Sequence, residues 1–115
     1  MVYTNDNIKK ICNFYVSDWH LAVMLLPYIN KEINKGTKIT TVFQNNMRNN
    51  IETLVRKLNL KNEKEILQID WNTKNNSILE RYVKENLSGG EENLFIINGD
   101  KEYVEKSNEK VIEYI

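Results

Sequence analysis

The sequence predicts an α/β fold, a three-layer α/β/α sandwich in which four short parallel strands alternate with four helices. Short apolar segments precede amphipathic ones about every 27 residues, which is the pattern of repeated βα units. The length of 115 residues is that of one domain. A hydrophobic fraction of 41%, a charged fraction of 28% and one proline are typical of a folded globular chain. We therefore expect a single α/β domain over residues 1–115.

The first βα unit begins with a strand over residues 10–16, which are rich in aromatic and β-branched side chains. Ser17 and Asp18 follow as a pair of helix N-cap residues. A helix over residues 19–35 comes next, because its apolar side chains lie on or near one stripe. Gly36 ends that helix.

The second unit combines a strand over residues 38–43 with a helix over residues 47–58, whose apolar side chains recur at helical spacing. The third unit begins with a short strand over residues 65–70. A polar loop then leads to a helix over residues 77–87.

The fourth unit is a strand over residues 94–98, a turn at Gly99 and a helix that Asp100 caps and that continues to the chain end. Strands joined through helices run parallel, and right-handed crossovers place helices on both faces of the sheet. The order of the four strands stays open at this point.

The charges exclude one class of partner. Lys plus Arg number 16 and Asp plus Glu number 16, so the net charge is zero and the chain lacks the cationic surface of a duplex nucleic-acid binder. Residues 1–60 carry eight basic and four acidic side chains, and residues 61–115 carry eight basic and twelve acidic ones. This polarity is compatible with head-to-tail self-association or a polarised protein partner, but the simpler explanation is that exposed helix faces differ in charge.

One cysteine, Cys12, and one histidine, His20, cannot supply the ligands of a structural zinc site. We expect no cofactor, because the loop after the first strand has no glycine to cradle a phosphate. The chain begins without a signal-like segment and no window approaches the ~20 apolar residues of a membrane span. We expect a cytoplasmic protein without membrane contact.

In open parallel sheets, ligands bind beyond the carboxyl ends of the strands, so the loops that follow the strands are the place to look for a site. A small-molecule ligand at these loops is one possibility that the sequence allows. The candidate ligand-binding residues are Asp18, Trp19, His20, Asp70, Trp71 and Asp100.

Each of these residues has a second interpretation. If the first and third predicted strands are neighbours, Asp18 and Asp70 could bind a divalent cation, yet Asp18 and Asp100 also occupy N-cap positions. The two tryptophans could form a stacking wall for a ligand, or each could cap an end of the core. His20, in a first helical turn, could contact a ligand as a neutral imidazole or be packed or solvent-facing. The sequence shows no combination of a nucleophile, a general base and a residue to orient the base.

Three segments resemble the MEDS sensory domain of bacteria: residues 12–18 (CNFYVSD), residues 25–29 (LLPYI) and residues 34–38 (NKGTK). The resemblance covers residues 10–70 and extends more loosely to about residue 100. It implies a degenerate RecA-type or KaiC-type α/β domain without a phosphate loop and a role in signalling. Members of that family often begin the first strand with a histidine, where this chain has Lys10. Members are often fused to kinases or transcription regulators, for which this chain leaves no room, so we expect it to act through a separate partner.

Two functions follow as hypotheses. The first is a non-enzymatic regulatory or sensory module that binds a small ligand or a protein partner at the strand-end loops and self-associates. The alternative is a small metal-dependent phosphoryl-transfer or nuclease-type enzyme that uses Asp18, Asp70 and Asp100.

Overall fold

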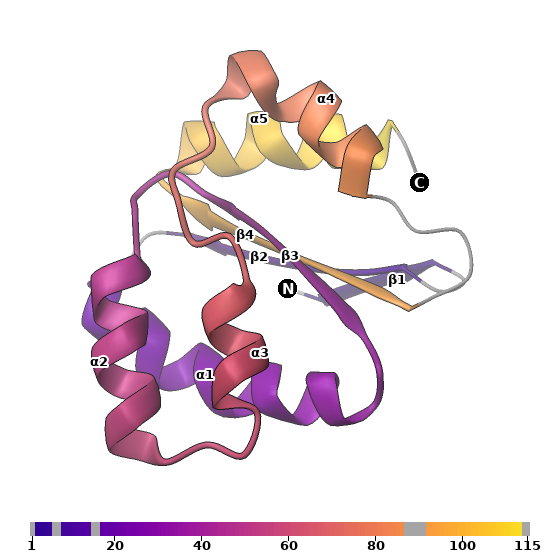
Figure 1. Cartoon of the computed structure of the whole chain (residues 1–115). Coiled ribbons are helices and arrows are strands. Elements are labelled where there is room, and N and C mark those ends of the chain that lie inside the picture. The colour runs from indigo at the N-terminus through magenta and orange to yellow at the C-terminus, as the bar shows by residue number, and fades with distance from the viewer. Residues whose placement is uncertain (1, 6–7, 15–16, 87–91, 114–115) are drawn as a thin grey trace.

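The computed structural model describes residues 2–5, 8–14, 17–86 and 92–113 and shows an α/β fold (Figure 1). Helices α1, α2 and α4 begin and end within one residue of their predicted bounds. The strands are β1 (Val2–Asn5), β2 (Ile8–Phe14), β3 (Lys38–Phe43) and β4 (Asn93–Gly99). The helices are α1 (Asp18–Asn34), α2 (Arg48–Leu58), α3 (Glu63–Gln68), α4 (Asn76–Asn86) and α5 (Lys101–Ile112).

The four strands of the described residues form one sheet in the order β1-β2-β4-β3. Strands β2, β4 and β3 are parallel, as the βα alternation predicts, with Cys12 opposite Ile97 and Val42 opposite the same residue from the other side. Strand β1 pairs antiparallel with β2. Strand β1 was not predicted, because its four residues are too few to show a clear hydrophobic period.

The predicted strand over residues 65–70 is wrong, because this segment forms helix α3. Ile66 is buried and Leu67 and Ile69 pack against the same core, while Glu65 and Gln68 are exposed. Apolar residues in so short a segment fit a helical face as well as a strand, and periodicity alone cannot separate the two. The parallel part of the sheet therefore has three strands instead of four.

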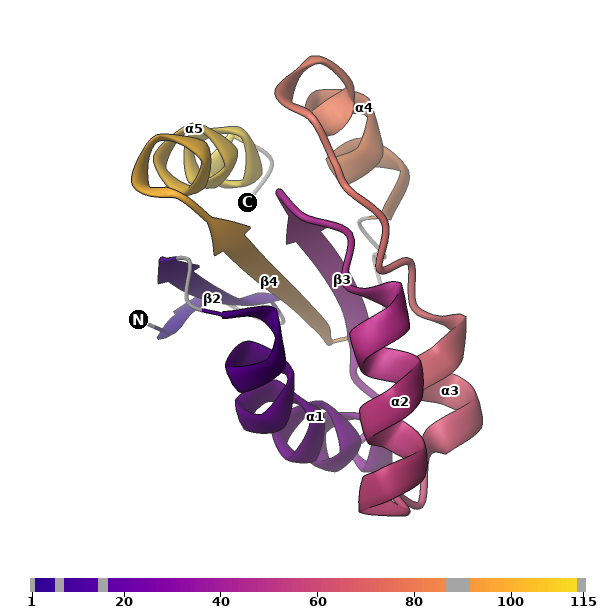
Figure 2. The same ribbon diagram turned by 90° about the vertical axis from the view of Figure 1, so that its left-hand side faces the viewer.

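Helices cover both faces of the sheet. Figures 1 and 2 show α1, α2 and α3 on one face and α4 and α5 on the other. Strand β4 lies in the middle and its alternate side chains supply both cores: Leu94 and Ile96 join the cluster under α1, whereas Phe95 and Ile97 join the cluster under α4 and α5. Successive side chains of a strand point to opposite faces of the sheet, so a strand buried along its whole length needs a layer of helices on each face.

Between α3 and α4 the chain passes from one face of the sheet to the other, and we call residues 69–75 the crossing segment. The strand order requires this passage, since the chain must return from the outer strand β3 to the central strand β4 on the second face. The segment runs beside the end of β3, where Thr73 bridges Phe43 and the Lys74 N–H donates to the Phe43 carbonyl at 2.9 Å.

In the parts of the chain that the structure describes, no helix combines the length and the apolar character that crossing a membrane requires.

Candidate functional site

The carboxyl ends of β3 and β4 are closed by a side-chain latch. Gln44, directly after β3, donates through Nε2 to the carboxylate of Asp100 at 3.0 Å and accepts from the Asp100 backbone N–H at 2.7 Å. The hollow beside this latch, which Tyr103 and Lys106 also line, measures about 130 Å³. Cavities that bind small molecules usually measure about 300–1,000 Å³. The latch therefore leaves little room for a ligand between these two strands.

Gly99 makes the latch possible. A Cβ atom at this position would lie 2.5 Å from Cδ1 of Tyr103 and 2.7 Å from Oε1 of Gln44. Only a residue without a side chain lets the ring and the amide approach the backbone so closely.

Asp100 is the N-cap of α5, which confirms one of its two predicted roles, the other being ligand binding. Its carboxylate accepts from the Tyr103 N–H at 2.8 Å. This bond and the bond from Gln44 lower the pKa of Asp100 below its usual value. The carboxylate is thus committed to two partners within the protein.

Ser17 is the N-cap of α1, where its hydroxyl accepts from the His20 N–H at 3.2 Å. The predicted N-cap position of Asp18 is wrong, because Asp18 is the first helical residue. Its predicted metal-binding role rests on a side chain that the structure does not describe. The side chains of Trp19 and His20 are exposed. The Lys57 ammonium group lies 5.5 Å from the centre of the Trp19 ring, which is within the range of a cation–π contact.

Asp70 lies in the crossing segment and is held by local partners. Its carboxylate pairs with Lys74 at 2.9 Å and accepts from the Asn72 N–H at 3.1 Å. Partial burial raises the pKa of this carboxyl group, but the hydrogen bonds from Lys74 and Asn72 and the charge of Lys74 outweigh it and leave the pKa below its usual value.

The structure does not bring the predicted aspartates together as a metal site. Asp18 follows β2, Asp70 lies outside β3, and β4 stands between those strands, so two inter-strand spacings of ~4.8 Å separate the strands themselves. Asp18 and Asp70 could share a cation only if the segment before Asp70 were a strand beside β2. That segment is helix α3, so the condition is not met. Among the described residues, no three Cys, His, Asp or Glu side chains come together as possible ligands.

Trp71 is fully buried and anchors the crossing segment to the core. Its indole N–H donates to the Ile66 carbonyl at 2.9 Å, and its ring lies 5.7 Å from that of Phe43, centre to centre. A buried Trp71 cannot form a ligand wall with Trp19. Trp71 instead completes the core, which is the second of the two roles that the sequence allowed.

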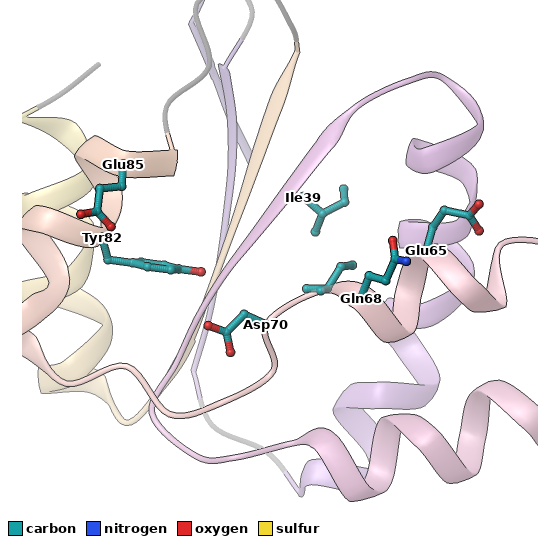
Figure 3. Close-up of a pocket in the computed structure, with 7 residues that line it drawn as sticks. Ile39, Glu65, Gln68, Asp70, Tyr82 and Glu85 are labelled. Carbon is teal, nitrogen blue, oxygen red and sulfur yellow. The ribbon is translucent and has the colours of Figure 1, made fainter.

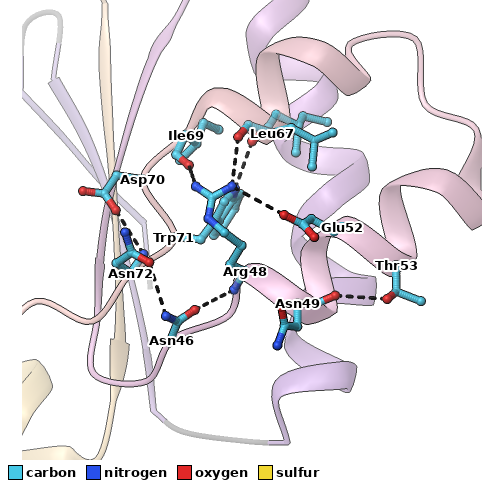
Figure 4. Close-up of polar contacts among 11 residues, drawn as sticks. Asn46, Arg48, Asn49, Glu52, Thr53, Leu67, Ile69, Asp70, Trp71 and Asn72 are labelled. Atoms are coloured by element: carbon cyan, nitrogen blue, oxygen red, sulfur yellow. Dashed lines mark hydrogen bonds and ion pairs between the residues drawn. The ribbon is translucent and has the colours of Figure 1, made fainter.

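Arg48, which is not among the predicted site residues, also holds the crossing segment (Figure 4). Its guanidinium group donates to the carbonyls of Leu67 at 3.3 Å and Ile69 at 3.0 Å, at the end of α3. Arg48 is the first residue of α2, where the helix dipole disfavours a cation. A positive charge at that unfavourable position was the signal that a partner outside its own helix holds it.

Asn46 continues this network. It accepts from the Arg48 N–H at 2.9 Å and donates to the Asn72 side chain at 3.2 Å (Figure 4). Asn46 and Arg48, which follow β3, therefore fasten the crossing segment together.

The exposed apolar surface gathers on α1. Trp19, Val23 and Met24 have exposed fractions of 45%, 44% and 52%, and Pro27 is exposed one turn further along. Because residues four apart share one face of a helix, these four residues form a stripe, which we call the α1 stripe. The stripe begins at the edge where the parallel strands end.

Comparison with protein-family models, with curated proteins and with solved structures finds no match for this chain, so the resemblance to the MEDS domain stays a prediction.

Proposed function

We propose that this protein is a non-enzymatic binding module that acts by contacting a protein through the α1 stripe. The observation that carries the proposal is the gathering of Trp19, Val23 and Met24 on one exposed helix face at the strand-end edge. Single exposed apolar residues are ordinary on protein surfaces, whereas a contiguous group that includes a tryptophan is typical of an interaction site.

The polar groups near the same edge favour a binding role over catalysis. Asp100 is engaged by Gln44 and by the start of α5, and Asp70 is engaged by Lys74. A catalytic carboxylate must be able to reach a substrate or a metal ion. The metal-dependent enzyme has no observation of this kind in its favour.

A second copy of the chain is the first partner to test. Val23 lies midway between Trp19 and Pro27, so two α1 helices that cross antiparallel about Val23 would each bury the partner's stripe under two-fold symmetry. The charge difference between the two halves of the sequence is compatible with such pairing, because it offers both signs to a partner.

The test is the molar mass in solution, measured by light scattering after size exclusion over a range of protein concentrations. We expect the wild type to rise above the monomer mass of 13.6 kDa as concentration increases, and the double variant Trp19→Ser/Met24→Ser to stay at that mass. The control variant Ile78→Ser/Ile112→Ser removes equally exposed apolar side chains from α4 and α5 and should behave as the wild type.

Two results would contradict the proposal. Equal loss of association in both double variants would show that general surface hydrophobicity drives it. A wild type that stays monomeric at every concentration, with no Trp19 fluorescence change on addition of any co-purifying protein, would remove the α1 stripe as a contact surface.

A further inference from the structure

A hollow of about 500 Å³ lies at the outer edge of β3, between α3 and α4 (Figure 3). Figure 3 shows side chains from α3 on one side of β3 and side chains from α4 on the other, with Asp70 of the crossing segment between them. This is the size of a typical ligand cavity, and it is open along one side of a strand. Its lining residues are Ile39, Glu65, Gln68, Ile69, Asp70, Tyr82 and Glu85.

Alternate residues of β3 direct their backbone groups away from the sheet at this hollow. The Lys38 N–H donates to the Glu92 carbonyl at 2.8 Å and the Gln44 N–H donates to the Asn98 carbonyl at 3.0 Å, so the even-numbered residues of β3 bond toward β4. The N–H and C=O of one strand residue point to the same side, and those of the next residue point to the other. Ile39 therefore directs both of its backbone groups outward.

Further along β3, the outward-facing groups have partners. The Phe43 carbonyl accepts from the Lys74 N–H at 2.9 Å, and the Thr41 carbonyl accepts from the Tyr82 hydroxyl at 3.0 Å. No bond to the outward N–H and C=O of Ile39 is found among the described residues. An edge strand with free backbone groups is the template to which a further strand adds.

The charges around the hollow favour an added strand with basic side chains. Three carboxylates line it, those of Glu65, Asp70 and Glu85, and none of the lining residues that the structure describes is basic. Asp70 pairs with Lys74, and Glu85 pairs with Arg81, whose side chain is largely exposed. Exposed pairs such as Arg81–Glu85 contribute little and exchange partners readily, so a lysine or arginine entering from outside can share the Glu85 carboxylate and approach that of Glu65. Asp70 stays engaged by the nearly buried Lys74.

We infer that the open part of the β3 edge binds an extended segment of another protein, which adds as a strand beside Ile39 and places a lysine or arginine near Glu65 and Glu85. A second copy of this chain fits less well, because pairing β3 with β3 would bring the same carboxylates of both copies together and like charges repel. This surface is separate from the α1 stripe and does not depend on it.

The probe is an acetylated and amidated seven-residue peptide in which threonine and lysine alternate. Binding is followed in two-dimensional ¹H–¹⁵N NMR spectra of the full chain labelled with ¹⁵N. We expect the Ile39 amide to shift, with a dissociation constant on the order of 0.1–1 mM. The same peptide with glutamate in place of lysine, and the lysine peptide with every amide N-methylated, should each bind at least about tenfold more weakly.

Variants of the protein test the same surface from the other side. Glu65→Gln/Glu85→Gln should weaken binding about fivefold, and Glu105→Gln/Glu113→Gln, which changes the net charge equally on and just after α5, should leave it unchanged. Ile39→Pro removes the outward N–H without removing a bond to β4 and should weaken binding about tenfold. Trp19→Ser/Met24→Ser should bind as the wild type, which separates this inference from the proposed function.

Four results would overturn the inference. The first is equal binding of the lysine and glutamate peptides. The second is equal binding of the N-methylated peptide, which needs no variant to fold. The third is a set of shifts centred on α1 instead of on Ile39. The fourth is no shift at 5 mM peptide, a concentration about five times the weakest expected dissociation constant.

Discussion

Strand β3 presents the same kind of backbone edge along its whole length, but the crossing segment covers only the half that ends at Phe43. There Lys74 bonds to the Phe43 carbonyl and Trp71 packs against the Phe43 ring. In the half that begins at Lys38, the outward groups of Ile39 face a hollow. A few anchoring contacts therefore decide where this edge is protected. Buried Trp71, together with Arg48 and Asn46, fixes where the crossing segment meets β3, and the segment is too short to cover the rest.

The largest expected effect comes from removing that anchor. Trp71→Ala deletes a fully buried ring and its bond to the Ile66 carbonyl, so we expect the free energy of unfolding to fall by about 3–5 kcal/mol. Urea denaturation followed by circular dichroism measures the change. Trp71→Phe keeps most of the volume and leaves the Ile66 carbonyl without its partner, at a cost of about 1–3 kcal/mol.

Trp19 provides the matched control for this substitution. The Trp19 side chain is 45% exposed, so Trp19→Ala should change the free energy of unfolding by no more than about 0.5 kcal/mol. Similar losses for Trp71→Ala and Trp19→Ala would contradict the assignment of Trp71 as the anchor.

A smaller loss is expected at Gly99, which lies at the closed end of the sheet. The added methyl group of Gly99→Ala would overlap the Tyr103 ring and the Gln44 side chain, and overpacking of this kind costs about 1–3 kcal/mol. Combining it with Gln44→Ala should restore part of the loss, since the Gln44 Oε1 atom is removed, although the Tyr103 ring and the Cβ atom of residue 44, 2.9 Å from the added carbon, remain. If the double variant loses as much free energy of unfolding as the two single variants together, the overlap is relieved elsewhere.

Lys74 tests the crossing segment itself. Its nearly buried side chain pairs with Asp70, donates to the Asn72 carbonyl at 2.9 Å and lies 4.9 Å from the centre of the Tyr82 ring. Lys74→Ala should cost about 1–3 kcal/mol, and Lys74→Met should cost less because it keeps the apolar stem. Hydrogen exchange should rise at residues 69–75 in both variants, whereas that of α1 should not.

The smallest effect is a dependence of stability on pH. The pKa of Asp70 is lower in the folded protein than its usual value, so the unfolded chain binds the proton more tightly. The stabilisation is therefore complete above the unfolded pKa of about 3.9 and is lost as pH falls through the folded pKa. A carboxyl NMR titration measures this pKa directly. In Lys74→Met the Asp70 pKa should rise, and an unchanged value would show that Lys74 is not its main partner.

Local patterns in the sequence were enough to predict most helices and the parallel strands. The alternation of apolar segments and N-cap residues located α1, α2, α4 and the three parallel strands, because these signals act within a few residues. The segment that forms α3 was assigned wrongly, since Ile66, Leu67 and Ile69 fit either period. At the candidate site, the prediction that Asp100 caps α5 is confirmed. The partners of Arg48 and Trp71 lie outside their own elements, so the sequence could indicate at most that each has a partner, not which one.

The sequence by itself determined that this protein is an α/β domain, because hydrophobic periodicity and capping are properties of neighbouring residues. Only the tertiary structure decided the strand order, the antiparallel β1 and the path of the crossing segment. These depend on which surfaces remain unburied after the helices have packed, and that is settled over long distances in the chain. The same long-range packing buried one tryptophan, exposed the other, and left half of the β3 edge open.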